Sequence, residues 1–334
     1  MTPPKTIAEL IQGKRVIGYG AGLTLYQTQA TFPLPLQYVV DDTPSLAGTS
    51  ACGIPVYGPE KLCAENKENL VIIIYADSPA VIFKVASFLD SLNLVWGEQY
   101  LDCSLIHFES MAGRITALTG AQPCWQRFHL ARMQRFLLSV QSISFIAGTW
   151  LYSELLDAHC ERIPGDIAEC GVYKGGNALS TLLISRVACS RPYHLLDSFE
   201  GFPELSQHDP ASRRHDFQDA EFGTLRNLFR NFPNVVIHKG WFRETLPQMP
   251  ERNYSMVYVD CDLYEGTREL CEYFYPRLSP GGCLLFHDYW YPEQELIHQT
   301  PFHGVKAAIA DVLPEMIDSL VIFPETTHAL LVKR

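Results

Sequence analysis

The sequence predicts an α/β fold in two parts, each built around a mainly parallel sheet, with an antiparallel hairpin closing the second part. Apolar, β-prone runs alternate with helix-like segments along most of the 334 residues. Near-continuous apolar runs are typical of parallel strands that are covered on both faces. The last two runs, 319–325 and 328–334, lie only two residues apart. Because a parallel crossover needs about a dozen residues, these two runs are predicted to pair as a hairpin.

The first part covers residues 1–105. Its strands are predicted at 15–20, 37–42, the start of 53–62, and 70–76. TIAELIQG predicts a helix before the first strand, Pro59 opens a helix after the third, and VIFKVASFLDSL predicts a helix after the fourth. Residues 106–163 lack a comparable strand pattern and predict helices that link the two parts.

The alternation restarts in the second domain, residues 164–334. Its parallel strands are predicted at 166–172, 193–199, 234–240, 255–261 and 282–288. Five parallel strands followed by a hairpin form the Rossmann-like plan of the class I S-adenosylmethionine (SAM) methyltransferases. The hairpin distinguishes this plan from an ordinary Rossmann dehydrogenase. A second, smaller Rossmann-like α/β domain would then precede it.

Composition narrows the class of partner. A net charge of −11 argues against nucleic acid or an anionic membrane, since both favour a basic surface. The ten cysteines contain no C-x-x-C pair, and the N-terminus has no apolar signal segment. These features predict a reduced, cytoplasmic protein. The run at 71–74 is too short to cross a bilayer. The oligomeric state stays open, with a homo-oligomer among the alternatives.

The first glycine loop, GYGAGLT, follows the first predicted strand. A dinucleotide fingerprint would have a further glycine where this chain has Leu23, although Asp41 or Asp42 stands at about the expected ~20-residue distance. The loop is equally compatible with nucleotide binding and with a tight turn that requires small residues.

The second glycine loop, AECGVYKGGN, follows a strand and opens a helix. Its glycines Gly171, Gly175 and Gly176 let the backbone approach a ligand, and the helix N-terminus offers free N–H groups. Glu169 is expected to meet an amine, and Asp197 to accept the hydroxyls of a ribose. SAM carries an amine, a carboxylate and a ribose, so the combination predicts a SAM site. The alternative is that the glycines only form a turn and Asp197 only caps a helix.

Paired acids end the fourth predicted strand of the second domain. In MVYVDCDLYEGT, Asp260 and Asp262 follow a buried apolar run, and Asp288 ends the next strand. Carboxylates gathered at neighbouring strand ends repel one another unless a cation or a proton balances them. Some cation or proton acceptor is therefore favoured here, and a divalent ion held by Asp260 and Asp288 would relieve the repulsion. The alternative, stronger for Asp262, is that these acids favour the first turn of the helix LYEGTRELCEYF.

Five blocks, IPGDIAECGVYKGG, LLDSFEGFP, KGWFRETLP, VDCDLYEGT and LSPGGCLLFHDYW, resemble the macrocin and mycinamicin sugar O-methyltransferase family over roughly residues 140–334. The resemblance implies SAM-dependent, Mg²⁺-assisted methylation of a hydroxyl on a sugar or another polyhydroxylated natural product. The cofactor site that it implies consists of Glu169, Gly171, Gly175, Gly176, Asp197, Ser198, Lys239, Gly240 and Trp241.

The metal site implied by the resemblance is Asp260, His287 and Asp288. His287 departs from the family pattern, which has an aspartate there, and a nitrogen ligand suits Mg²⁺ poorly. Three alternatives follow: a softer divalent ion, Asp262 as the third ligand, or a metal-free site in which His287 is the base. A hydroxyl needs a Lewis acid or a base to take up its proton. Asp260 and His287 are therefore the predicted catalytic residues.

Other features predict less. His303 is expected to lie ahead of a helix, and the aromatic group 289–291 suits either sugar stacking or lid packing. Residues 208–223 are predicted to form a lid or specificity loop. The first domain loosely resembles small Rossmann-type domains of sugar C-methyltransferases and acetyltransferases, which implies substrate binding or assembly. Two other functions stay open: a nicotinamide-dependent oxidoreductase that uses the first loop, and a non-catalytic nucleotide-binding protein.

Overall fold

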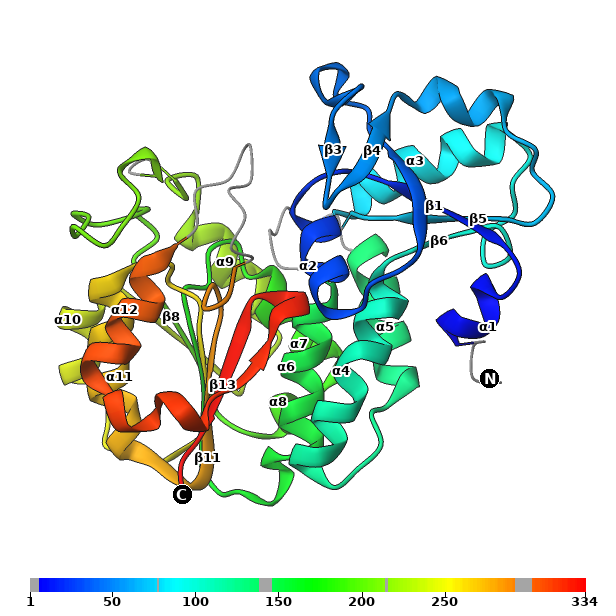
Figure 1. The fold of residues 1–334 in the computed structure, drawn as a ribbon. Coiled ribbons are helices and arrows are strands. Elements are labelled where there is room, and N and C mark those ends of the chain that lie inside the picture. Colours follow the sequence, from blue (N-terminus) through cyan, green and yellow to red (C-terminus); the bar gives the residue numbers. More distant parts are fainter. Residues whose placement is uncertain (1–5, 77, 138–145, 214–215, 292–301) are drawn as a thin grey trace. The chain divides into compact units, whose positions relative to one another are not determined.

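The computed structural model describes residues 6–76, 78–137, 146–213, 216–291 and 302–334. The described residues divide into two compact units, one up to Gly113 and one from Arg114 onward. Each unit has its own sheet and its own helices (Figure 1). None of the described helices combines the length and the apolar character needed to cross a membrane.

The first unit is built on a six-stranded sheet in the order β3-β4-β2-β1-β5-β6. Its strands are β1 (Arg15–Tyr19), β2 (Leu36–Val40), β3 (Ser50–Ala51), β4 (Ile54–Tyr57), β5 (Leu70–Ile74) and β6 (Tyr100–Asp102). All pairings are parallel except β3 with β4. Its helices are α1 (Ile7–Ile11), α2 (Leu23–Thr31), α3 (Pro79–Ser91) and α4 (Ser104–Thr119), which runs on past Gly113, and the helix that Pro59 opens is a 3-10 helix, η2 (Pro59–Ala64).

The first glycine loop is shaped by a close approach of two strands. Gly20 has φ +105°, and a Cβ there would lie 2.6 Å from the carbonyl oxygen of Tyr75. Asp41 accepts hydrogen bonds from the backbone N–H groups of Ala21 and Thr43, at 2.7 and 2.8 Å. Both observations favour the turn interpretation of this loop, since the glycine and the acid are needed to form it.

The second unit is built on a seven-stranded sheet in the order β12-β13-β11-β10-β7-β8-β9. Its strands are β7 (Asp166–Cys170), β8 (Tyr193–Asp197), β9 (Val235–Lys239), β10 (Tyr254–Val259), β11 (Leu278–Phe286), β12 (Val321–Phe323) and β13 (His328–Val332). The first five are parallel, and β13 pairs antiparallel with both β11 and β12. The predicted five parallel strands and the predicted hairpin are confirmed.

Helices and short 3-10 turns complete the second unit. They are α5 (Trp125–Leu137), α6 (Ile146–Ala158), η3 (Cys160–Arg162), α7 (Gly176–Ile184), α8 (Arg186–Ser190), η4 (Ala211–Arg213), α9 (Phe222–Leu228), α10 (Phe242–Thr245), η5 (Leu246–Gln248), α11 (Tyr264–Arg277), α12 (His303–Val312), η6 (Pro314–Ser319) and η7 (Pro324–Thr326).

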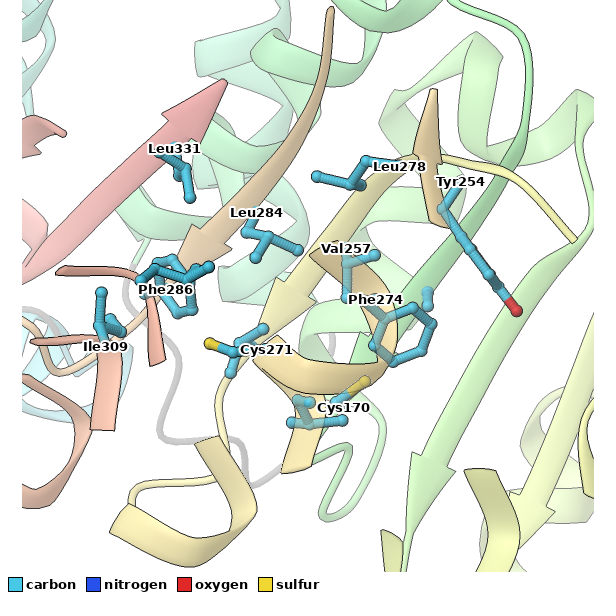
Figure 2. Packing of buried hydrophobic residues seen from close by; sticks show 14 of the residues in the cluster. Cys170, Tyr254, Val257, Cys271, Phe274, Leu278, Leu284, Phe286, Ile309 and Leu331 are labelled. Atoms are coloured by element: carbon cyan, nitrogen blue, oxygen red, sulfur yellow. The ribbon is translucent and has the colours of Figure 1, made fainter. Parts of the chain in front are cut away.

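One hydrophobic core fixes the strands that lead to the predicted site. Figure 2 shows Cys271 and Phe274 of α11 against Cys170 of β7 and Val257 of β10, with Phe286 of β11 in the same cluster. All five side chains are fully or almost fully buried. Burial of side chains of this size stabilises the fold by roughly 1.5–3 kcal/mol each. The carboxyl ends of β7, β10 and β11 are therefore held by packing, as a preorganised site requires.

A chain of polar side chains crosses β7, β8 and β9 and makes stability depend on pH. His194 Nε2 lies 3.1 Å from a carboxylate oxygen of Asp166, and its Nδ1 lies 3.0 Å from Nε2 of His238. Burial, and then the neighbouring His194, lower the pKa of His238 to about 4. The unfolded chain therefore binds more protons than the folded chain between about pH 6.5 and 4, and the folded state loses stability as pH falls through that window.

We expect the free energy of unfolding to drop by about 1 kcal/mol across this window, after allowance for solvent screening of the half-buried ring. Urea unfolding at a series of pH values measures the drop, and His238→Gln should flatten the dependence. His208→Gln removes an exposed histidine and should leave the slope unchanged. Equal slopes for wild type and His238→Gln would refute the assignment.

Candidate functional site

The predicted site residues gather at one edge of the second sheet because they follow strands that are neighbours. Cys170 pairs with Leu196 of β8 and with Val259 of β10, and Val259 pairs with Phe286 of β11. Asp197, at the end of β8, pairs with Lys239, at the end of β9. The carboxyl ends of five adjacent parallel strands thus carry all the predicted cofactor and metal residues, which is where open α/β sheets bind ligands.

The second glycine loop is built on close contacts that only glycine permits. Gly171 has φ +89°, and a Cβ there would lie 1.8 Å from the carbonyl oxygen of Asp260. Gly175, with φ +80°, is the N-cap of α7, and a Cβ there would lie 2.8 Å from Leu225 and from Phe229. Gly176 is the buried first residue of α7. The loop therefore lies directly against the residue that begins the acid cluster.

Asp197 holds the glycine loop through its carboxylate. One oxygen accepts hydrogen bonds from the backbone N–H groups of Val172 and Tyr173, both at 2.8 Å, and the other accepts one from Phe199 N–H at 2.7 Å. Burial raises the pKa of Asp197, although these three bonds oppose the rise. These hydrogen bonds tie Asp197 to residues of two loops, so they do not form the helix cap that was the alternative interpretation. A carboxylate has about four acceptor sites, so ribose binding by Asp197 stays a prediction that is compatible with these bonds.

Glu169 is the next-to-last residue of β7. Its side chain is buried, and one carboxylate oxygen accepts hydrogen bonds from the Tyr193 hydroxyl and from Asn177 Nδ2. Burial is the main cause that raises the pKa of Glu169 to about 8, so the group is largely protonated at neutral pH. Two of the protein's own side chains thus bond to one oxygen of this carboxyl group, and its contact with a cofactor amine stays a prediction.

The remaining predicted cofactor residues lie after β8 and β9. Ser198 Oγ accepts a hydrogen bond from Glu200 N–H at 3.1 Å and donates one to the Gly201 carbonyl at 3.2 Å, which closes a turn after β8. Gly240 has φ +139°, and its N–H donates to the Asp197 carbonyl at 3.0 Å. Trp241 is the partly exposed N-cap of α10. Lys239 is exposed, with Nζ 5.5 Å from the ring centroid of Phe222.

The acid cluster consists of Asp260, Asp262, His287 and Asp288. One candidate ligand atom from each lies within 4.8 Å of the others. His287 Nδ1 lies 2.8 Å from Oδ1 of Asp260 and 3.4 Å from Oδ2 of Asp288. Asp262 and Asp288 both have left-handed backbones, with φ +64° and +53°. Such a conformation is uncommon outside glycine, and it clusters at functional sites.

The charges in this cluster compensate one another. Burial, and then the charges of Asp288 and Asp260, raise the pKa of Asp262 well above its usual value. Burial of His287 would lower its pKa, but the carboxylates of Asp260 and Asp288 outweigh burial and raise it well above the ordinary value. Burial would likewise raise the pKa of Asp288, but His287 holds it below its usual range. Both shifts favour the protonated forms of Asp262 and His287, and either proton would offset part of the carboxylate charge.

The donor set of the cluster fits a divalent cation. Three carboxyl groups supply the oxygen ligands that Mg²⁺ and Mn²⁺ prefer, and the imidazole adds a ligand suited to softer ions. A bound cation would replace the balancing charges, because carboxylates release their protons when they bind a metal. The structure brings Asp262 into the set, as one of the sequence alternatives requires. A metal-free base formed by His287 and Asp260 stays the alternative, and it requires a neutral His287, whereas the two carboxylates favour the charged ring.

Two residues that contact the acid cluster were not predicted from the sequence to be part of the site. Tyr291 was grouped with the aromatic residues 289–291, but its hydroxyl donates to Asp288 at 2.5 Å. His328 is fully buried, and its ring centroid lies 4.8 Å from that of His287. Burial, and then His287, lower the pKa of His328 well below its usual value, so this ring stays neutral. The sequence signal that could have identified His328 is its position as a histidine at the start of an apolar strand.

In the described part of the polar segment predicted as a lid, two aspartates accept hydrogen bonds from neighbouring elements. Asp219 accepts hydrogen bonds from the Tyr173 hydroxyl and Lys174 Nζ, at 2.6 and 2.5 Å, next to the glycine loop. Asp209 accepts one from the backbone N–H of Tyr264, the first residue of α11, at 2.9 Å. His303 begins α12 and is exposed. The lid function itself stays a prediction.

Comparisons with known proteins match the second unit to O-methyltransferases. A family model described as Macrocin-O-methyltransferase (TylF) matches residues 151–323, which are 173 of the 334 residues. The chain is 34% identical over 142 residues to the 8-demethyl-8-(2,3-dimethoxy-alpha-L-rhamnosyl)-tetracenomycin-C 4'-O-methyltransferase of Streptomyces olivaceus, covering 39% of this chain and 54% of that protein. It is 30% identical over 169 residues to the mycinamicin III 3''-O-methyltransferase of Micromonospora griseorubida, covering 46% and 66%.

A third curated relative is the demethyldecarbamoylnovobiocin O-methyltransferase of Streptomyces niveus, 31% identical over 141 residues, covering 38% of this chain and 54% of that protein. The chain spans between about half and two thirds of the length of these relatives. Among solved structures, the O-methyltransferase NovP is 23% identical with a TM-score of 0.46, covering 69% of this chain and 99% of NovP. The calicheamicin methyltransferase CalS11 is 22% identical with a TM-score of 0.48, covering 67% and 91%.

Proposed function

Because the chain belongs to the TylF macrocin-O-methyltransferase family, we propose that its second unit transfers the methyl group of SAM to a hydroxyl group of a sugar or of another polyhydroxylated natural product. The observation that carries the proposal is the contact between the two predicted halves of the site. Gly171 of the cofactor loop leaves no room for a Cβ beside the backbone of Asp260, which begins the acid cluster. A nucleoside on the loop and a hydroxyl at the cluster would therefore be neighbours.

In this proposal the cofactor lies along the glycine loop and the ends of β8 and β9. The N–H groups at the start of α7 would bind the carboxylate of SAM. Asp197 and Ser198 would face the ribose, and the segment Lys239–Trp241 would border the adenine. Glu169 supports the loop from below, because Asn177 in the first turn of α7 donates a hydrogen bond to it.

The acid cluster would activate the acceptor hydroxyl. A divalent ion, when bound, supplies a Lewis acid that lowers the pKa of a hydroxyl. Asp260, Asp262 and Asp288 would hold that ion, with His287 completing the donor set. Asp260 also accepts the hydrogen bond of His287 Nδ1, an arrangement that fixes one tautomer of a histidine base. The remaining requirement is an in-line approach of the hydroxyl to the methyl group, which positioning alone can supply.

Binding and turnover of the full chain test the proposal. Isothermal titration with S-adenosylhomocysteine should show saturable binding, and NADH should show none. Labelled SAM should transfer its methyl group to glycosylated natural products that carry vicinal hydroxyls. Absence of S-adenosylhomocysteine binding would reject the proposal.

Removal of divalent metal distinguishes the metal-assisted mechanism from the one in which His287 and Asp260 act as the base. If the cluster works through a divalent ion, EDTA should abolish turnover, and Mg²⁺ or Mn²⁺ in excess should restore it. Turnover that persists in EDTA would leave His287 and Asp260 as the proton acceptor.

A further inference from the structure

The C-terminal hairpin reaches the acid cluster through the side chain of His328. We propose that His328 is a positioning residue, which holds the ring of His287 in the orientation used by the acceptor site. The inference rests on the function proposed above, and it adds a residue from outside the cluster to the machinery of that site.

Contacts on two sides fix the His328 ring. His328 begins β13 and is fully buried, and its Nε2 lies 2.9 Å from the hydroxyl of Tyr258 in β10. The ring of Tyr258 packs in turn on Tyr152 of α6, with centroids 4.8 Å apart. The His328 ring also contacts His287, at 4.8 Å between centroids and an interplanar angle of 55°. A ring held in this way limits the rotation of its neighbour, because packed interiors leave little free volume.

The backbone of the same hairpin holds the chain on both sides of the His287–Asp288 pair. Ahead of the pair, Phe286 is paired with Ala329 of β13. After the pair, the carbonyl of Thr327 accepts hydrogen bonds from the N–H groups of Tyr289 and Trp290, at 2.9 and 3.2 Å. The hairpin therefore positions the strand end before the pair, the loop after it and the side chain of His287 together.

A substitution at Gly148 can perturb the contact between His328 and His287 without changing either histidine. It lies in α6, and a Cβ there would lie 3.1 Å from Cε1 of His328, which is tighter than ordinary contacts. Alanine is preferred over glycine inside a helix by roughly 1 kcal/mol, so Gly148→Ala should not weaken the helix. The added methyl group would press on His328 and through it on His287, without touching the acid cluster itself.

We expect Gly148→Ala to lower kcat about 10-fold, with the KM for SAM and the affinity for S-adenosylhomocysteine within about twofold of wild type and the melting temperature not reduced. Gly113→Ala is the matched control, since it also replaces a helical glycine but has nothing within 4 Å of the new Cβ. It should leave kcat unchanged. In a His328→Ala background, Gly148→Ala should have no further effect on kcat, because the methyl group then has no ring to displace.

Substitutions of His328 itself give the second measurement. His328→Phe keeps a ring but loses the bond to Tyr258, whereas His328→Gln can place an amide nitrogen where Nε2 lies. Gln should therefore retain more kcat than Phe. Equal kcat values for His328→Gln and His328→Phe would overturn the positioning role. This comparison remains decisive even if Gly148→Ala does not fold.

Histidine-selective ¹⁵N spectra of the ligand-free protein supply a readout that does not depend on turnover. The ring signals of His287 should shift in Gly148→Ala and stay in place in Gly113→Ala. Unshifted His287 signals together with a wild-type kcat would overturn the inference. A shift in a protein whose wild type transfers no methyl group would instead show that the contact exists and that the proposed function has failed.

Discussion

Asp260→Asn is expected to lower kcat for methyl transfer by about 10³-fold, while the affinity for S-adenosylhomocysteine stays within about twofold. The substitution removes the charge that faces His287 and that would bind a cation. General-base and metal contributions of this kind are worth roughly 10²–10⁴-fold and more. The amide keeps the size of the side chain, so the backbone bond from Asp260 N–H to Cys170 should persist.

Single-turnover rates with labelled SAM, together with titration calorimetry, measure the two quantities separately. Asp318→Asn makes the same isosteric change at an exposed aspartate in η6 and should leave both unchanged. If Asp260→Asn turned over at the wild-type rate, the acid cluster would have no part in catalysis. If it lost S-adenosylhomocysteine binding instead, the residue would serve the cofactor loop.

Gly171→Ala is expected to destabilise the second unit by at least 4 kcal/mol, which corresponds to a fall in melting temperature of about 10 °C or more. The Cβ would lie 1.8 Å from the Asp260 carbonyl, in a backbone with φ +89°. The ends of β7 and β10 would have to separate to make room for the methyl group. Separation would break the 2.8 Å hydrogen bond from Asp260 N–H to the Cys170 carbonyl. Separation would also displace the glycine loop, so S-adenosylhomocysteine binding should be lost.

Gly223→Ala provides the matched comparison, because Gly223 lies in α9 with nothing within 4 Å of a new Cβ. It should be neutral or stabilising by up to about 1 kcal/mol. Thermal unfolding followed by circular dichroism compares the two variants. A melting temperature for Gly171→Ala equal to that of wild type would mean that the close approach does not exist.

The strands of the second unit could be predicted because parallel strands covered on both faces are long apolar runs. The hairpin followed from a two-residue separation that excludes a crossover. In the first unit, β3 and β6 were not predicted, because strands of two and three residues carry no recognisable pattern. The helix after Pro59 was predicted without its 3-10 geometry, which six residues do not reveal.

The gathering of the candidate residues at one edge of the sheet could be predicted, because strand ends identify the edge of a parallel sheet. The direction of each side chain could not. Nothing in the sequence shows that Tyr193 and Asn177 bond to Glu169, since both depend on strand register and helix placement. His328 lies 41 residues after His287, and only the antiparallel register of β11 and β13 brings the two rings together.

The hydrogen bonds that attach Asp209 and Asp219 of the 208–223 segment differ in their exposure to water. Asp219 is largely exposed, so its pairing with Lys174 competes with water and contributes little. Asp209 is partly buried: it accepts two hydrogen bonds from Ser206 and one from the N–H of Tyr264, and it lies close to Gly304 of α12. Next to Tyr173, the ring of Phe217 also packs on the tyrosine ring, with centroids 5.1 Å apart. High salt should therefore weaken the Asp219 end of the segment while leaving this ring contact in place.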